Sequence, residues 1–117
     1  MYGEFILTLL HAATNAHIHH FKTRSYAQHM ALAGFYEEVV DLADTLTEAI
    51  QGLTGELVDF PQDYYAPADT ALQEMMELKD FVKEGRKTLP DDSEIQNIVD
   101  EIADLINTTL YKLRFLS

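Results

Sequence analysis

The sequence predicts an all-α protein, a single domain over residues 1–117 in which four helices form an antiparallel bundle with a crossover between the second and third. Three observations predict this fold. Apolar residues recur at three- and four-residue spacings in four separate segments. Glycines and prolines are few and mostly grouped between these segments. A chain of 117 residues, 47% of them hydrophobic, is long enough for one core but too short for two.

The first helix is predicted over residues 4–21. Its apolar stripe recurs at helical spacing and consists of Ile6, Leu10, Ala13, His17 and Phe21. Residues 22–25 break this pattern, so we expect a turn there. Either Thr23 or Ser25 can then cap the helix that follows, because a side-chain hydroxyl accepts a hydrogen bond from a free amide of the first helical turn.

The second helix is predicted to be the longest and to end at Gly52, since glycine readily terminates helices. Residues 53–67 then change character, because glycine and prolines punctuate a segment that holds Phe60, Tyr64 and Tyr65. We interpret this segment as a crossover whose aromatic side chains pack onto the bundle.

The third and fourth helices are predicted from their starting residues. Asp69 is the expected cap of the third, which ends near Gly85. The fourth opens after Pro90, where Ser93 and Gln96 stand at capping-box spacing. With short first and last connections and a longer middle one, this is the pattern of a four-helix bundle with a crossover.

Composition excludes several classes of function. The formal net charge of −12 argues against contact with nucleic acid, because phosphate binding needs clustered Lys and Arg. The absence of cysteine removes disulfides, thiolate nucleophiles and Cys-based zinc sites. The apolar run at residues 5–10 is too short to span a bilayer and lacks the basic leader of a signal peptide. We therefore expect a cytoplasmic protein with no membrane and no nucleic-acid partner.

Two pairs of side chains are candidate metal ligands. His17 and His29 each lie six residues from a turn centred near Thr23, so an antiparallel hairpin is expected to bring them side by side. Asp44 and Glu48 are one turn apart on one flank of the second helix, as paired carboxylate ligands often are.

The two pairs cannot meet within one chain. Fifteen residues separate His29 from Asp44, which is about 22 Å of helix at roughly 1.5 Å per residue. A site that uses both must lie between subunits, with two antiparallel copies of the second helix related by an axis near Glu37 and Glu38. We expect His19 and His20, which flank the turn, to be exposed or to cap a helix.

This spacing resembles the ferroxidase pattern of the Dps-like branch of the ferritin-like superfamily. Histidines stand at 17 and 29, and carboxylates at 44 and 48. Short stretches such as Ser25-Tyr26-Ala27-Gln28-His29 also look like small uncharacterised phage-encoded relatives of that superfamily. The resemblance implies a ferritin-like bundle that is at least a homodimer through its first two helices. It also implies an iron site formed by histidines of one subunit and carboxylates of its mate.

One departure from this pattern leaves two functions open. The family's further acidic ligand falls on Ala33 in this sequence. The leading hypothesis is an intersubunit site that binds iron, or another divalent metal, for oxidation or sequestration. The alternative is a non-catalytic helical homo-oligomer of the same fold whose metal site is degenerate, acting as a scaffold or protein-interaction module.

Overall fold

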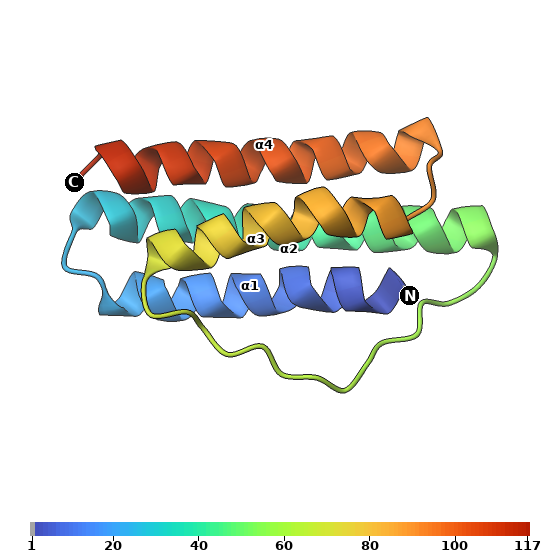
Figure 1. Cartoon of the computed structure of the whole chain (residues 1–117), viewed down its shortest axis with the longest axis horizontal. Helices are drawn as coiled ribbons and strands as arrows, with labels where there is room; N and C mark the ends of the chain where they lie inside the picture. Colours follow the sequence, from blue (N-terminus) through green and yellow to red (C-terminus); the bar gives the residue numbers. More distant parts are fainter. Residues whose placement is uncertain (1) are drawn as a thin grey trace.

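The computed structural model describes residues 2–117 as four α-helices and one short 3-10 helix (Figure 1). The elements in chain order are α1 (Tyr2–Lys22), α2 (Tyr26–Thr54), α3 (Ala71–Gly85), η1 (Arg86–Thr88) and α4 (Ser93–Phe115). The predicted all-α class is confirmed. None of these helices is long and apolar enough to cross a membrane.

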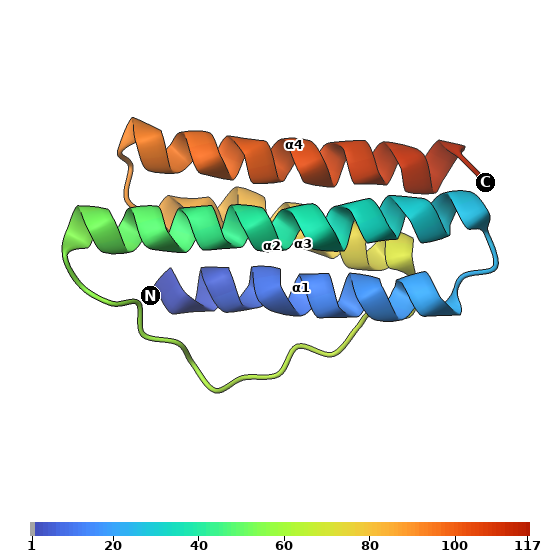
Figure 2. The same cartoon turned by 180° about the vertical axis from the view of Figure 1, so that it is seen from behind.

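The four helices pack as a bundle in which neighbours run antiparallel. α1 packs against α2 and α3, and α4 packs against the same two helices. The extended segment 55–70 carries the chain back along the length of the bundle, so α2 and α3 run in the same direction (Figures 1 and 2). The predicted crossover therefore joins the second and third helices. The connection from α1 to α2 and the one from α3 to α4 are both short.

Large apolar side chains from all four helices form one continuous core. Its largest fully buried members are Phe5, Ile6, Leu9, Leu32, Phe35, Val39, Leu46, Ile50, Met75, Ile95, Ile102 and Ile106. The buried face of α1 differs from the predicted stripe, since Leu10 and His17 are only half-buried and Phe21 is 73% exposed. Because α1 contacts two helices, its buried face is centred between them, and the predicted stripe runs along the edge of that face.

The ends of α2 agree with the prediction at one terminus only. Ser25 is the N-cap, and its Oγ accepts a hydrogen bond from the Gln28 amide at 3.2 Å. The helix continues past Gly52 and ends at Gly55, which adopts the left-handed conformation (φ 73°) and donates its N–H to the Gln51 carbonyl. The pattern of the sequence pointed to the wrong glycine because both residues suit a helix end.

The starts of α3 and α4 also differ from the prediction. Thr70 caps α3 in place of Asp69, and its Oγ1 accepts the Gln73 amide at 3.1 Å. At α4 the predicted capping box is not formed. The Gln96 side chain instead donates to the carbonyl of Pro90 at 3.0 Å and to that of Arg86 at 3.2 Å. Gln96 therefore braces the α3–α4 connection and does not satisfy the first turn of its own helix.

The crossover is held against α1 at both of its ends. A Cβ atom built on Gly3 would stand 1.9 Å from the carbonyl oxygen of Asp59, so only glycine allows this approach of two backbones. Farther along, the rings of Tyr64 and Tyr65 meet the ring of His11 edge-on, with centroids 5.9 and 5.2 Å away. Tyr65 is half-buried, so the prediction that aromatic residues of the crossover pack onto the bundle is confirmed for it. Tyr64 touches His11 but is 73% exposed, and Phe60 is 42% exposed.

Candidate functional site

The imidazoles of His20 and His29 form a stacked pair that closes the α1–α2 hairpin. Their centroids are 3.6 Å apart and their planes are inclined by 17°. Each Nδ1 lies against the backbone carbonyl of the other residue, at 2.6 Å for His20 Nδ1 to His29 O and 2.9 Å for His29 Nδ1 to His20 O. A carbonyl can only accept, so each Nδ1 carries a proton and is the donor of its bond.

The position of this pair gives it a capping role. The carbonyl of His20 belongs to the last turn of α1, where backbone carbonyls have no partner within the helix. The Nδ1–H of His29 satisfies that carbonyl and ties α1 to α2 at the same time. We call the two residues the histidine clasp. His20 is 9% exposed and His29 half-buried, so solvent screens the clasp only in part.

His17 lies beside the clasp but has other partners. Its ring stacks on Tyr36 at 4.1 Å and on Phe21 at 4.8 Å, and it meets His20 edge-on at 5.8 Å. The ring against His29 is that of His20, where the sequence analysis expected that of His17. The loop joining the helices is residues 23–25, so its centre lies one residue later than assumed. This shift moves the position opposite His29 from residue 17 to residues 19 and 20, and of these two it is His20 whose ring stacks on His29.

The clasp as it stands cannot chelate one metal ion. A metal bound to imidazole lies near the ring plane, about 2.0–2.1 Å from the nitrogen. Two nearly parallel rings stacked 3.6 Å apart direct their lone pairs along separate planes, so one ion cannot lie in both. In this arrangement a metal ion can be bound by one of the two rings but not by both.

The two predicted carboxylates lie on the exposed surface of α2. Asp44 and Glu48 stand one turn apart and are both solvent-exposed. Across residues 2–117, no three His, Cys, Asp or Glu side chains come close enough together to hold a metal ion. Within a single chain, His17, His29, Asp44 and Glu48 therefore do not form one site.

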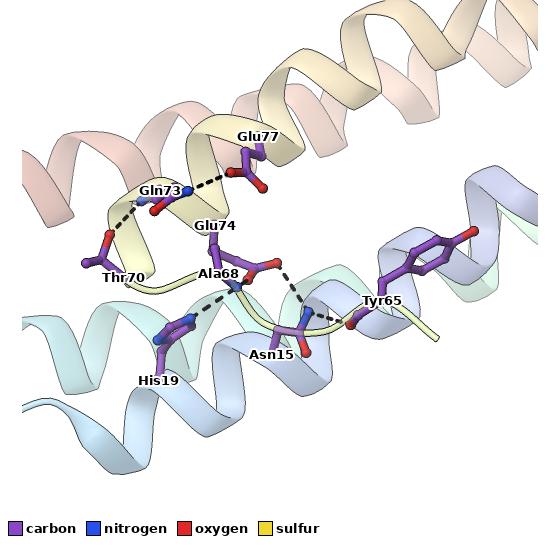
Figure 3. Close-up of polar contacts among 8 residues, drawn as sticks. All are labelled: Asn15, His19, Tyr65, Ala68, Thr70, Gln73, Glu74 and Glu77. Atoms are coloured by element: carbon purple, nitrogen blue, oxygen red, sulfur yellow. Dashed lines mark hydrogen bonds and ion pairs between the residues drawn. The ribbon is translucent and has the colours of Figure 1, made fainter. Parts of the chain in front are cut away.

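A second polar cluster lies where α1, α3 and the end of the crossover meet (Figure 3). The carboxylate of Glu74 accepts the Ala68 amide at 2.7 Å through Oε1 and the Asn15 side-chain amide at 3.3 Å through Oε2. Asn15 also donates to the carbonyl of Tyr65 at 3.1 Å. The imidazole of His19 points towards the same carboxylate, with Nε2 3.8 Å from Glu74 Oε1. We call this set the Glu74 junction.

The junction is buried, and one of its atoms lacks a partner. Asn15 is 3% exposed, His19 6%, and the side chain of Glu74 14%. His19 Nε2 is buried and makes no hydrogen bond, because 3.8 Å is too long for one. The group has no nucleophile beside a base, so its geometry suits anchoring of the crossover rather than catalysis.

This junction was not predicted, and the prediction that His19 is exposed or caps a helix is wrong. His20 is not exposed either, but it belongs to a pair with a capping role, which was the other predicted outcome for it. Both histidines are buried, since α1 is covered by α2 on one side and by α3 on another. Consecutive residues of a helix point about 100° apart. His20 can therefore reach α2 while His19 faces α3. The sequence could have indicated the junction through helical spacing. Asn15 and His19 follow Ala12 at spacings of three and four residues, so all three lie on one face of α1.

Comparisons with known proteins relate the chain to a protein family and to a phage protein. Residues 20–113 match the model of a family of unknown function, DUF5856. The chain is also 29% identical over 112 residues to an uncharacterized 14.6 kDa protein from the mobD–ri intergenic region of enterobacteria phage T4. That alignment covers 94% of this chain and 85% of the phage protein. No solved structure matches significantly. Since the family model spans most of the bundle, the chain belongs to the DUF5856 family.

Proposed function

We propose that this protein is a non-catalytic helical homodimer, a scaffold or protein-interaction module whose subunits pair through the outer face of α1 and α2. One observation carries the proposal. Gly34 lies in the middle of α2, where glycine costs about 1 kcal/mol relative to alanine. Apart from its chain neighbours and the backbone of its own helix, no atom lies within 4 Å of the position its Cβ would take. Nothing in the described chain explains the cost, and packing of a second subunit against Gly34 would.

The side chains around Gly34 support the same interface. Tyr26, Met30 and Gly34 follow one another at four-residue spacing and form one stripe along α2. Tyr26 is 76% exposed and Met30 51%, and Phe21 of the adjoining helix is 73% exposed. Exposed apolar groups gathered in this way are typical of interaction sites.

The two-fold axis of this dimer is placed near Met30. If two copies of α2 run antiparallel about an axis at Met30, Tyr26 of each subunit lies over Gly34 of the other. The large tyrosine side chain then fills the space that glycine leaves free. Farther along the stripe stand Glu37, Asp41, Asp44 and Glu48, all exposed. With the axis near Met30, the acids of the two copies lie far from one another. An axis near Glu37 would bring the carboxylates of both copies together, where they repel each other.

The test compares two glycines of the same helix. Gly34→Leu should convert the dimer to monomer in sedimentation velocity because the leucine occupies the space of the partner's Tyr26. Gly52→Leu is the matched control, since Gly52 is also exposed inside α2 with nothing within 4 Å of its Cβ position. It should leave the dimer intact. A wild-type monomer, or equal effects of both variants, would reject the proposed interface.

The second candidate is the intersubunit iron site, which implies a ferritin-like bundle of the Dps-like branch. One observation favours it. The Nδ1 of His29 is held by a backbone carbonyl, and metal-binding histidines are usually oriented by such a contact while Nε2 binds the ion. Bringing His29 to Asp44 and Glu48 of a second copy requires an axis near Glu37 and Glu38. That axis lies about 11 Å along α2 from the one near Met30.

This difference in register separates the two candidates. The chain has no cysteine, so single spin labels can be attached at Met30→Cys or Glu37→Cys. The label nearest the axis gives the shorter interspin distance. Metal content after chelator-free purification, and ferric absorbance during ferrous titration, then test the iron site directly. Ala33→Asp should strengthen metal binding, and no bound metal in either protein would remove this candidate.

A further inference from the structure

A shallow apolar groove with a cationic rim lies between α3 and α4. Val82, Ala103 and Ile106 line it, and Lys79, Lys83 and Arg86 stand around them. The chain has only 8 Lys and Arg against 20 Asp and Glu. Three cations around one groove therefore make this surface basic in a protein that is acidic as a whole.

Two of these cations form no ion pair within residues 2–117. Arg86 pairs with Asp100 at 2.7 Å. Within residues 2–117, no carboxylate oxygen lies within 4.0 Å of the ammonium of Lys79 or Lys83. The two lysines are one turn apart on α3, an arrangement in which like charges destabilise a helix. An acidic group bound at the groove would relieve this repulsion.

The size of the groove favours one apolar side chain as its occupant. Its volume is about 180 Å³. Sites for small organic ligands usually measure about 300–1,000 Å³. A single leucine flanked by carboxylates would match both the apolar floor and the cationic rim.

The chain carries such a segment at the start of its crossover. Leu57 is 85% exposed, the highest fraction among the exposed large hydrophobic residues of the described chain. Glu56 precedes it and Asp59 follows two residues later, and both are exposed. We call Glu56, Leu57 and Asp59 the acidic tip.

The acidic tip cannot enter the groove of its own chain. The Val58 amide donates to Gln51 Oε1 at 2.9 Å, and the backbone of Asp59 lies against Gly3. The crossover runs along the side of α1 that faces away from α4 (Figures 1 and 2). These contacts hold the tip beside Gln51 and Gly3, neither of which lines the groove, so the contact proposed below is one between copies.

We propose that the α3–α4 groove of one copy receives the acidic tip of another. Leu57 fills the space over Val82 and Ile106, while Glu56 and Asp59 face Lys79 and Lys83. Because the two surfaces are different, this contact is head-to-tail and builds rings or filaments, unlike the two-fold pairing through α2. The two interfaces share no residues, so each can fail without the other.

The test uses complementary charge reversals in the full chain. The wild type should form species larger than a dimer as its concentration rises in sedimentation velocity. Lys79→Glu with Lys83→Glu should abolish these species, and so should Glu56→Lys with Asp59→Lys. An equimolar mixture of the two variants should restore them, because each acidic surface then meets a basic one. Leu57→Ser should weaken the association roughly tenfold or more.

The matched control changes net charge by the same amount elsewhere. Lys112→Glu with Arg114→Glu, both at exposed positions of α4, should leave the larger species in place. Absence of larger species in the wild type would overturn the proposal. A mixture that does not restore association would also overturn it. Since Gly34→Leu affects only the two-fold interface, its result shows separately whether the proposed dimer fails.

Discussion

His19 and His20 are adjacent in sequence and are both buried, but only His20 makes a side-chain hydrogen bond. His20 belongs to the histidine clasp, where Nδ1 is 2.6 Å from a carbonyl and the ring stacks on His29. His19 belongs to the Glu74 junction, where Nε2 is buried without a hydrogen bond. In the clasp the histidines are the bonded groups, whereas in the junction the carboxylate is. Residue type therefore does not tell which buried polar side chain stabilises the fold.

The largest effect is expected from removing the Glu74 carboxylate, which accepts the hydrogen bonds of the junction. Glu74→Leu should lower the free energy of unfolding by about 2–3 kcal/mol, because it leaves the Ala68 amide without an acceptor and removes one of the two acceptors of the Asn15 side-chain amide. Urea denaturation measures this loss. Glu77→Leu is the matched control, since Glu77 is exposed on the same helix and accepts only one side-chain bond, from Gln73. Equal losses in the two variants would contradict the assigned role of the junction.

The clasp is tested by a double-mutant cycle. His20→Phe and His29→Phe each keep an aromatic ring but remove one Nδ1 donor, and each should cost about 1–2 kcal/mol of unfolding free energy. The two losses should not add, because the rings contact each other. Thermal or urea denaturation of the four proteins gives the coupling energy. Additive losses would mean that the two rings act independently.

The helix caps sharpen the comparison further. Ser25→Ala and Thr70→Ala should each cost about 1 kcal/mol, since each removes the acceptor of a free amide in a first helical turn. Ser25 lies beside the clasp and Thr70 beside the junction. The loss from Ser25→Ala should therefore change in a His29→Phe background, while that from Thr70→Ala should not. The reverse pattern would place the coupling elsewhere.

The smallest effect is expected at His19. His19→Leu should change the free energy of unfolding by less than about 1 kcal/mol, because it removes a buried Nε2 that makes no hydrogen bond. The Ala68 and Asn15 bonds to Glu74 remain. Urea denaturation alongside Glu74→Leu checks this. A loss as large as that of Glu74→Leu would show that His19 is an essential member of the junction.

Residue patterns predicted the helices well but the side-chain partners poorly. The four helices, the turn before Tyr26 and the crossover follow from helical periodicity and from the grouping of glycine and proline. The buried stripe of α1 was displaced because periodicity gives the spacing of a face but not the number of neighbouring helices that cover it. The pairing of His20 with His29 depended on a shift of one residue in the loop, which is smaller than a sequence pattern can resolve.

The sequence by itself determined the class of the fold, the order of its helices and the formal net charge of −12. These properties depend on local spacing and on sums over the chain, which any reader of the residues can evaluate. Only the tertiary structure decided that Glu74 reaches Asn15, 59 residues away, and that His17 stacks on Tyr36. Contacts of this kind are set by the rotation of each helix about its axis, and packing against several neighbours at once fixes that rotation.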